Sequence, residues 1–327
     1  MTTPLIKISA SKLKTFQTCS WLYWCKYHLR LPDKTNSGAL MGTCAHTIFE
    51  CLLNPRHRAA YDAIVGEKAT ITNSPAVARY VKRYLAKHGL PNELFNKVDT
   101  MIVVGLVTDF FCKGGKIVSP ELKFSIPFSN FVIGGFIDKP AEYNGKFIRI
   151  ADYKSSKKKF EGDELQINVQ AMMYSLAARH LWPTLTPIVD FIFLQFPTDP
   201  IQRLKFTDNQ LDGFKYMLSV VAEQMMGFTE KTAKGNYAAR QKMPGSGDGF
   251  KGPLVCGFAK KKGQLKKDGT PMYHCPFKFD FEYFALCDEK GEVKESSYSN
   301  NFKPDDSKGE FVVKKKYAGC PAWKKAA

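Results

Sequence analysis

Five side chains in the first half of the sequence have types and spacings that could do chemistry together. Asp152 and Lys154 lie two positions apart in the mostly apolar run IRIADYK. Residues two apart in a β-strand project from the same face, so these two side chains are expected to share one face. Asp138 ends the preceding strand-like run, GGFID. His46 and Glu50 are spaced by four in a helix-like segment, which places them on one helical face.

Two carboxylates and a lysine on adjacent antiparallel strands have a chemical use beyond a surface ion pair. Carboxylate oxygens are the ligands that hard divalent cations such as Mg²⁺ or Mn²⁺ prefer. A bound cation of this kind can polarise a phosphodiester and activate water. A lysine beside it can orient the water and offset the charge that develops on the phosphate. The pattern therefore predicts metal-dependent phosphodiester hydrolysis.

The elements that must position these residues follow from hydrophobic periodicity and from the turn residues between periodic segments. We expect helices over residues 12–29, 39–53, 75–89, 91–115, 163–182 and 207–230, and strands over 121–128, 130–138, 145–154 and 187–196. Ser9 and Ser11 could cap the first helix. Gln170 and Tyr174 are spaced by four and share a face of the helix that follows the Asp152 strand. This order of elements predicts a mixed α/β fold.

The same segments suggest an organisation along the chain. We expect residues 1–54 to form N-terminal helices of the core, 55–116 a helical insert, 117–232 the catalytic core and 233–327 a small C-terminal lobe. Residues 234–253 are a loop by composition. The lobe is basic, contains cysteines and carries little apolar mass, so a metal could help to hold it together.

Charge and hydropathy limit the class of protein. The chain has 48 Lys+Arg against 31 Asp+Glu, a formal net charge of +17, which favours a polyanionic partner, most simply nucleic acid. No run of about 18 apolar residues is present, so no transmembrane helix is expected. The N-terminus has no basic region followed by an apolar one, so we expect no signal peptide and a cytoplasmic location.

Five motifs in order resemble one known family, the PD-(D/E)XK nucleases, and within it the RecB-like exonuclease branch. The matching segments are SASKLKTFQTCSWLYW, GTCAH, GGFID, IADYKSS and QAMMYS, which span about residues 9–196. The resemblance implies a restriction-endonuclease-like core, a mixed sheet flanked by helices. It also implies site roles: metal ligation by His46, Asp138, Asp152 and the main-chain carbonyl of Tyr153, catalysis by Lys154, DNA contacts by Gln170 and Tyr174, and a further acid at Glu121.

The function implied is a Mg²⁺-dependent (exo)deoxyribonuclease that acts on DNA ends, with a single strand in its active site. Recombination, repair or phage replication is the setting that the resemblance suggests, and a phage-encoded enzyme would act in the host cytoplasm. Exonuclease action is favoured because this branch mostly trims ends and the sequence has no G-x-x-x-x-G-K-[ST] motif. Two alternatives stay open: a non-catalytic nucleic-acid-binding module with a nuclease-like fold, and a structure-specific endonuclease or RNase.

The nine cysteines raise the question of a second metal site. Many RecB-like nucleases hold a [4Fe–4S] cluster with one cysteine before the core and three after it. The resemblance implies Cys19, Cys256, Cys275 and Cys320 as ligands, with Cys287 as an alternative. The later cysteines are more widely spaced than is usual in the family, and no C-x-x-C occurs. Zinc, with or without His274, and no metal at all therefore remain alternatives.

Three groups of residues have more than one interpretation or a plain structural one. Lys157, Lys158 and Lys159 could form a solvated turn or meet phosphates. The aromatic residues Trp21, Tyr23, Trp24 and Tyr27 could stack bases but are expected to pack the core. We expect Cys25, Cys44, Cys51 and Cys112 to lie on helices as small buried hydrophobic residues.

Overall fold

The computed structural model describes residues 5–33, 36–235, 256–257, 259–267, 269 and 271–323. Most of the loop expected over residues 234–253 lies outside these ranges. The chain divides into two compact units: residues 1–10 with 35–223 form the first, and residues 11–34 with 224–327 form the second. Residues 11–34, which the sequence placed among the N-terminal helices of the core, thus cluster with the C-terminal residues.

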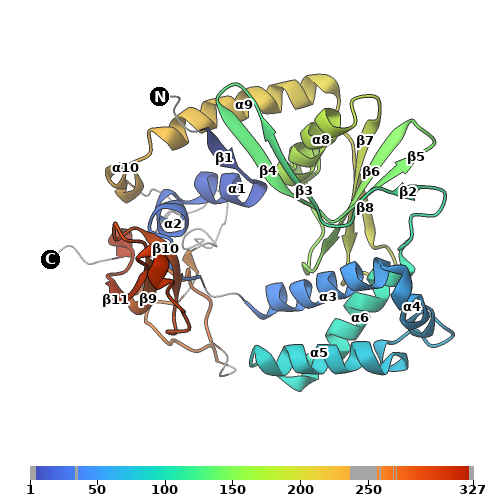
Figure 1. The fold of residues 1–327 in the computed structure, drawn as a ribbon, viewed down its shortest axis with the longest axis horizontal. Helices are drawn as coiled ribbons and strands as arrows, with labels where there is room; N and C mark the ends of the chain where they lie inside the picture. The colour runs from blue at the N-terminus through green and yellow to red at the C-terminus, as the bar shows by residue number, and fades with distance from the viewer. Residues whose placement is uncertain are drawn as a thin grey trace. The chain divides into compact units, whose positions relative to one another are not determined.

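A five-stranded mixed sheet forms the centre of the first unit (Figure 1). Its order is β2 (Lys116–Ile117), β5 (Lys139–Tyr143), β6 (Phe147–Lys154), β7 (Thr186–Phe193) and β8 (Ile201–Leu204). The central pair β6 and β7 is parallel and the other pairs are antiparallel. The central strands match the expected ones. The sequence did not predict β5 or β8, because β5 contains a lysine and a proline and β8 has four residues.

A second sheet of three strands adjoins it in the same unit. Its order is β1 (Ile6–Ile8), β4 (Phe131–Ile137) and β3 (Leu122–Pro127), with β1 parallel to β4 and β3 antiparallel to it. The run GGFIDKPAEY leaves β4, passes through Asp138 and enters β5 in the larger sheet. Asp138 therefore stands where one extended segment changes sheet.

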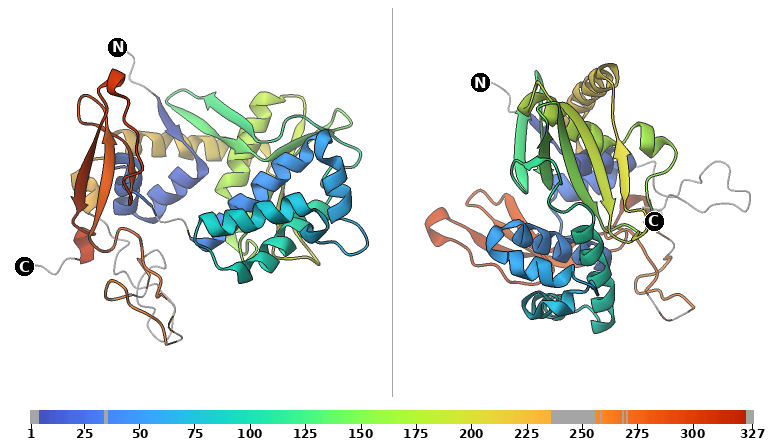
Figure 2. Two further views of the ribbon diagram at one scale, coloured as in Figure 1. Left: turned by 60° about the horizontal axis from the view of Figure 1, so that its bottom comes forward. Right: turned by 90° about the vertical axis from the view of Figure 1, so that its right-hand side faces the viewer.

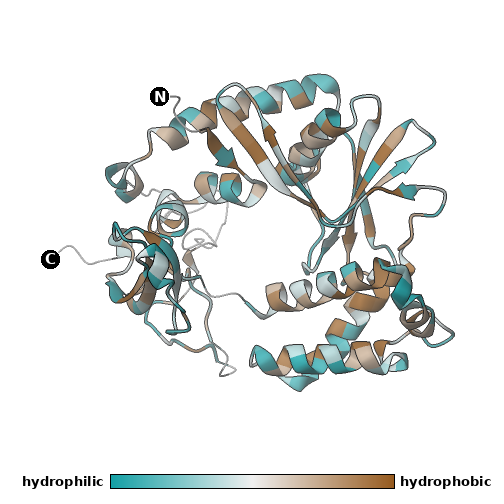
Figure 3. Ribbon diagram, in the orientation of Figure 1, coloured by the Kyte–Doolittle hydropathy of each residue, from teal (hydrophilic) through white to brown (hydrophobic). Residues whose placement is uncertain are grey.

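Four helices cover one face of the five-stranded sheet (Figure 2). They are α3 (Ser37–Leu53), α4 (Arg58–Ile64), α5 (Pro75–Lys87) and α6 (Phe95–Val107). Asn36 caps α3 by accepting a hydrogen bond from the Ala39 amide at 2.8 Å. Their apolar side chains form one buried cluster with Ala151 and Tyr153 of β6. Hydrophobic residues are concentrated in α3, α6 and the strands of both sheets (Figure 3).

Helix α8 (Val169–Leu181) packs on the opposite face, against β7 and also against β3 and β4. Asn168 begins it, accepting a hydrogen bond from the Ala171 amide at 3.0 Å. The helix expected over 163–182 is therefore two helices, the short α7 (Asp163–Gln166) and α8, because the side chain of Asn168 starts a new cap. Helix α9 (Asp208–Met226) follows β8 and matches the last expected helix.

The second unit contains a three-stranded antiparallel sheet, β10 (Val293–Ser297), β9 (Phe281–Cys287) and β11 (Phe311–Tyr317), in that order. The helix expected over 12–29 is interrupted at Cys19 between α1 (Ala10–Thr18) and α2 (Ser20–Tyr23), since the Cys19 Sγ caps α2 by accepting from the Leu22 amide at 3.4 Å. A π-helical turn, Trp24–His28, follows α2, and α10 (Glu230–Lys234) lies near the start of the C-terminal residues.

The second unit has a larger apolar core than the sequence suggested. Trp21, Phe277, Tyr283 and Tyr317 are buried together. The Trp21 indole donates to the Tyr317 hydroxyl at 2.7 Å. The core-packing interpretation of Trp21 and Tyr23 is thereby confirmed, because both side chains are buried. No helix within the described ranges has the length and the hydropathy needed to cross a membrane.

Candidate active site

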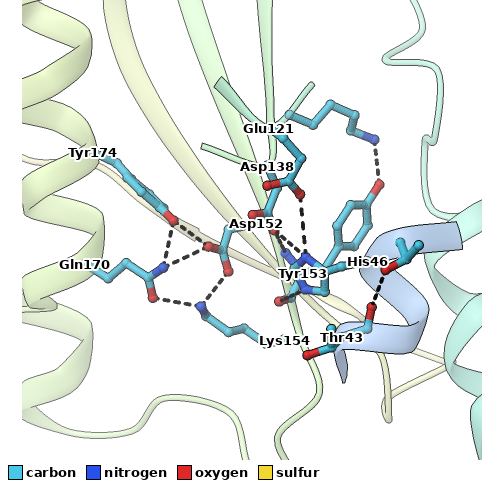
Figure 4. A network of polar contacts seen from close by, with 11 residues as sticks. Thr43, His46, Glu121, Asp138, Asp152, Tyr153, Lys154, Gln170 and Tyr174 are labelled. Atoms are coloured by element: carbon cyan, nitrogen blue, oxygen red, sulfur yellow. Dashed lines mark hydrogen bonds and ion pairs between the residues drawn. The ribbon is translucent and has the colours of Figure 1, made fainter. Parts of the chain in front are cut away.

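Strand β6 carries Asp152 and Lys154 on the face that α8 covers (Figure 4). Asp152 is 2% exposed, and its Oδ1 accepts hydrogen bonds from Gln170 Nε2 at 2.9 Å and from the Tyr174 hydroxyl at 2.8 Å. Gln170 and Tyr174 are joined by a further bond at 2.7 Å. The four residues that the sequence placed on a strand and a facing helix therefore form one polar network.

The Lys154 ammonium is held by two partners in this network. Its Nζ lies 2.6 Å from Asp152 Oδ2 and donates to Gln170 Oε1 at 2.7 Å. The ring of Phe191, whose centroid is 5.1 Å away, flanks it. The Lys154 side chain is 22% exposed, so it is held in position yet is not closed off from solvent.

Three possible metal ligands lie close together on the other side of the β6 backbone. Ligand atoms of His46, Glu121 and Asp138 are all within 4.8 Å of one another. His46 Nδ1 is 3.4 Å from Asp138 Oδ2 and 3.9 Å from Glu121 Oε1. His46 Nε2 is 3.1 Å from the main-chain oxygen of Tyr153. Across the described ranges, no other set of three His, Cys, Asp or Glu side chains meets that criterion.

Backbone contacts hold the acidic side chains in this place. The Tyr153 amide donates to Asp138 Oδ2 at 2.9 Å, and the Glu121 amide donates to the Asp138 carbonyl at 2.8 Å. Glu121 adopts a left-handed backbone conformation with φ of 49°, which is uncommon for a residue other than glycine. It lies directly before β3, beside Asp138 at the end of β4, so its carboxylate reaches the same point as that of Asp138.

The electrostatics reflect this crowding of acids. Burial disfavours a charged His46, but the nearby carboxylates of Glu121, Asp138 and Asp152 outweigh it, and the pKa of His46 is raised. Burial raises the pKa of Asp138, and the negative charge of Asp152 adds to the effect. The protonated His46 ring therefore supplies, among these acids, the kind of positive charge that a bound cation would also supply.

The donor set suits a hard divalent cation. It consists of carboxylate oxygens, an imidazole and a nearby main-chain carbonyl. Asp152 Oδ2 is buried and faces the Lys154 ammonium at 2.6 Å, an ion pair with which a bound cation would have to compete. Glu121 lies within the compact group in this arrangement, whereas both oxygens of Asp152 are engaged with α8 and Lys154. Ligation by Asp152 and Tyr153 stays a prediction.

A cleft of about 420 Å³ opens beside these ligands, along one face of α3. Its lining consists of Ala39, Gly42, Thr43, His46, Thr47, Glu50, Glu121 and Ser155. Glu50 is exposed there, one helical turn beyond His46. The sequence analysis did not single out Thr43, Thr47 or Ser155, although the spacing of the two threonines around His46 on one helical face is a usable signal.

Buried charges support the site from the opposite face of β6. Lys139 is 1% exposed, and its Nζ donates to the Phe110 carbonyl at 2.7 Å and to the Tyr153 hydroxyl at 2.9 Å. Burial lowers the pKa of Lys139 to about 8. Arg149 donates to Asp190 Oδ2 at 2.6 Å in the same layer. A lysine in a strand ordinarily points to solvent, so nothing in the sequence predicts that Lys139 is buried here.

Four cysteines of the second unit line one narrow cavity: Cys19, Cys256, Cys275 and Cys320. They are the four that the resemblance implied. Cys287 and His274 do not line it, and Cys287 is buried on β9. Within the described ranges, no three of these four sulfur atoms lie within 4.8 Å of one another.

Two smaller expectations need correction. Cys51 is exposed on α3, not buried, because it faces away from the α3–α6 cluster. Cys112 is buried but lies in a turn after α6 with φ of 53°, not on a helix. Lys157 and Lys158 are exposed, and Lys159 pairs with Asp199 at 2.6 Å.

Two comparisons with known proteins gave matches. The sequence matches the PD-(D/E)XK nuclease superfamily over residues 7–246. The chain belongs to the PD-(D/E)XK nuclease superfamily. A crystal structure described as a "Putative exonuclease" from Eubacterium rectale is 16% identical, with a TM-score of 0.43, over 67% of this chain and 80% of that one. No curated protein matches.

Proposed function

We propose that this protein is a divalent-metal-dependent deoxyribonuclease that removes nucleotides from DNA ends. The observation that carries the proposal is the grouping of His46, Glu121 and Asp138 within 4.8 Å, beside the Asp152–Lys154 pair at 2.6 Å. Membership of a nuclease superfamily supports the phosphodiester substrate. Exonuclease action and a role in recombination, repair or phage replication rest on the resemblance to the RecB-like branch.

Each side chain has a role that its position supports. His46, Glu121 and Asp138 would hold the cation, with Asp152 Oδ2 and the Tyr153 carbonyl beside them. A bound Mg²⁺ or Mn²⁺ supplies a Lewis acid for the phosphate and lowers the pKa of water. Lys154 can donate to the attacking water or to a phosphate oxygen, which offsets the charge that develops in the transition state. Gln170 and Tyr174 hold Asp152 and Lys154 in this orientation.

The experiment compares end-labelled linear DNA with a covalently closed circle, with millimolar Mg²⁺ and with EDTA. We expect the linear DNA to be degraded in Mg²⁺ but not in EDTA, and the circle to stay intact in both. Cleavage of the circle would assign an endonuclease. Cleavage of a matched RNA but not of the DNA would assign an RNase. Tight DNA binding without cleavage of any substrate, with Mg²⁺ or Mn²⁺, would favour the non-catalytic module.

We propose further that Cys19, Cys256, Cys275 and Cys320 hold a [4Fe–4S] cluster in the second unit. Their shared cavity supports it. The spacing of the thiols also matters, because sulfurs about 2.3 Å from one zinc ion would lie roughly 3.8 Å apart in a tetrahedron. The thiols do not form so compact a group. Wider spacing suits a cluster, in which each thiolate binds a different iron.

Iron, acid-labile sulfide and zinc analysis of protein purified without oxygen tests this cofactor. Iron and sulfide in equal amounts, with loss of both in Cys320→Ala, are expected. Cys287→Ala is the matched control, because Cys287 is also a buried thiol of the same unit but lies outside the cavity. Zinc without iron would identify the site as a zinc site. If the protein contains neither zinc nor iron, these cysteines are packing residues.

A further inference from the structure

The outer face of the three-stranded sheet continues directly from the metal-binding acids. On β3 and β4, side chains of one parity are buried toward α8, as Phe124 is, and those of the other parity face outward. Phe136 lies two residues before Asp138 on this outward side, opposite Lys123 in the β-sheet register. Phe136 is 55% exposed, and Lys123 is exposed too.

A second lysine reaches the same face one step further along. Lys7 of β1 is exposed and pairs in register with Val132 of β4. A Cβ at Gly134 would lie 2.2 Å from Lys7 Cε, so the Lys7 side chain runs over the surface that this glycine leaves open. Alternate residues along a strand are about 6.6 Å apart. Asp138, Phe136 and Gly134 therefore mark three evenly spaced positions leading away from the metal-binding acids.

An exposed aromatic ring between two lysines is the combination that single-stranded nucleic acid requires. Bases stack on aromatic side chains whatever their sequence, and lysines neutralise the phosphates on either side. A phenylalanine that is more than half exposed contributes less to the stability of the fold than a buried one, since burial of the ring is what contributes free energy. Two observations favour a nucleic-acid strand as the occupant of this sheet face. Lys7 and Lys123 are positively charged, and the face continues directly from Asp138 and Glu121.

We propose that the outer face of β1, β4 and β3 binds the nucleic-acid strand next to the scissile phosphodiester, with a base stacked on Phe136 and phosphates at Lys123 and Lys7. This inference rests on the proposed nuclease function and adds the path of the substrate. The path predicts that the protein holds its substrate as an unpaired strand here, because a base inside a duplex cannot offer its face to Phe136.

The test uses oligonucleotides with 2-aminopurine at successive positions, whose fluorescence reports stacking. Binding is measured with Lys154→Met protein and Mg²⁺, so that cleavage does not interfere. Phe136→Ala should weaken binding roughly 5- to 150-fold, the range for loss of one stacked base. It should also abolish the fluorescence change at one position of the strand, and Phe136→Trp should preserve both. Lys123→Gln should reduce the salt dependence of binding by about one charge.

Tyr216→Ala is the matched control, because Tyr216 is an aromatic residue of the same unit that is 73% exposed on α9. It should leave binding and fluorescence unchanged. The Lys154→Met protein is the reference for binding, and the wild type is the reference for cleavage. If the wild type cleaves DNA and Phe136→Ala leaves the affinity of the Lys154→Met protein unchanged, the assignment of this face alone is overturned. If the wild type cleaves no nucleic acid and the Lys154→Met protein binds none, the nuclease function is overturned, and this inference with it.

Discussion

Helix α3 approaches the segment after β6 so closely at Gly42 that alanine at this position should displace the site. A Cβ on Gly42 would lie 2.7 Å from Ser155 Oγ and 3.1 Å from Ser155 Cβ. Rotation of the serine hydroxyl can relieve the first contact but not the second. His46 lies one helical turn further along α3, where its Nε2 is 3.1 Å from the Tyr153 carbonyl. Any shift of α3 away from Ser155 therefore moves His46.

The size of the displacement follows from the contact. Rotating the hydroxyl leaves the 3.1 Å contact between the two Cβ atoms, which must lengthen by 0.3 Å to reach ordinary van der Waals contact at 3.4 Å. Misplacing a reacting group by about 1 Å can cost on the order of 100-fold in rate. We expect Gly42→Ala to lower the rate of cleavage by roughly 3- to 10-fold. The free energy of unfolding should fall by no more than about 2 kcal/mol, because overpacking costs about 1–3 kcal/mol while alanine gains about 1 kcal/mol over glycine inside a helix.

The assay measures cleavage of linear DNA against Mg²⁺ concentration, with thermal unfolding alongside. Gly213→Ala is the matched control, since Gly213 is in α9 and a Cβ there would meet nothing within 4 Å. It should keep full activity and gain stability. Adding Ser155→Gly to Gly42→Ala should restore activity by removing both contacting atoms. Wild-type rates and Mg²⁺ dependence in Gly42→Ala would refute the reasoning.

Further predictions concern other parts of the molecule. Lys154→Met should lower cleavage at least about 100-fold with unchanged circular dichroism, because it removes a charge aimed at the transition state; rates near wild type would exclude that role. Binding of the uncleaved complex should weaken by orders of magnitude between about 50 and 200 mM salt. Asp190→Asn should lower the free energy of unfolding near neutral pH by about 3 kcal/mol or more, measured with urea, since it leaves Arg149 without its buried carboxylate. Burial opposes the charge on Asp190, but Arg203 and Arg149 outweigh it and hold its pKa below the ordinary value. The stability that this carboxylate contributes is therefore present above about pH 3.9 and is lost as the pH falls through the lowered pKa, so the difference between wild type and variant should shrink below about pH 4.

Local patterns were enough to predict the strand that carries Asp152 and Lys154 and the helix that carries Gln170 and Tyr174. Period-two alternation placed Asp152 and Lys154 on one face, and the structure brings their charged atoms to 2.6 Å. Helical spacing placed Gln170 and Tyr174 together, and both contact Asp152. The spacing within each pair depends on residues two or four apart, so a regular backbone decides it, whereas the contacts of the helix with Asp152 depend on packing.

The sequence could not decide which acids meet, since that depends on contacts far apart in the chain. Glu121 joins His46 and Asp138 because a left-handed residue turns the chain directly before β3 and because GGFIDKPAEY crosses from one sheet to the other. Neither event has a periodic signature. The same holds for β5, whose buried Lys139 reverses the usual preference of lysine for solvent by bonding to Tyr153.

The cysteines show most plainly the difference between what the sequence predicts and what only the fold decides. The sequence suggested which four cysteines could serve together, but only by resemblance, and gaps of unusual length left zinc and simple packing open. Tertiary structure brings Cys19 to Cys256, Cys275 and Cys320 across more than 200 residues, and leaves Cys287 outside their cavity on β9. Sequence patterns determine which face of a strand or helix a side chain occupies. Which of those faces share a cavity depends on how distant elements pack, and only the folded chain decides it.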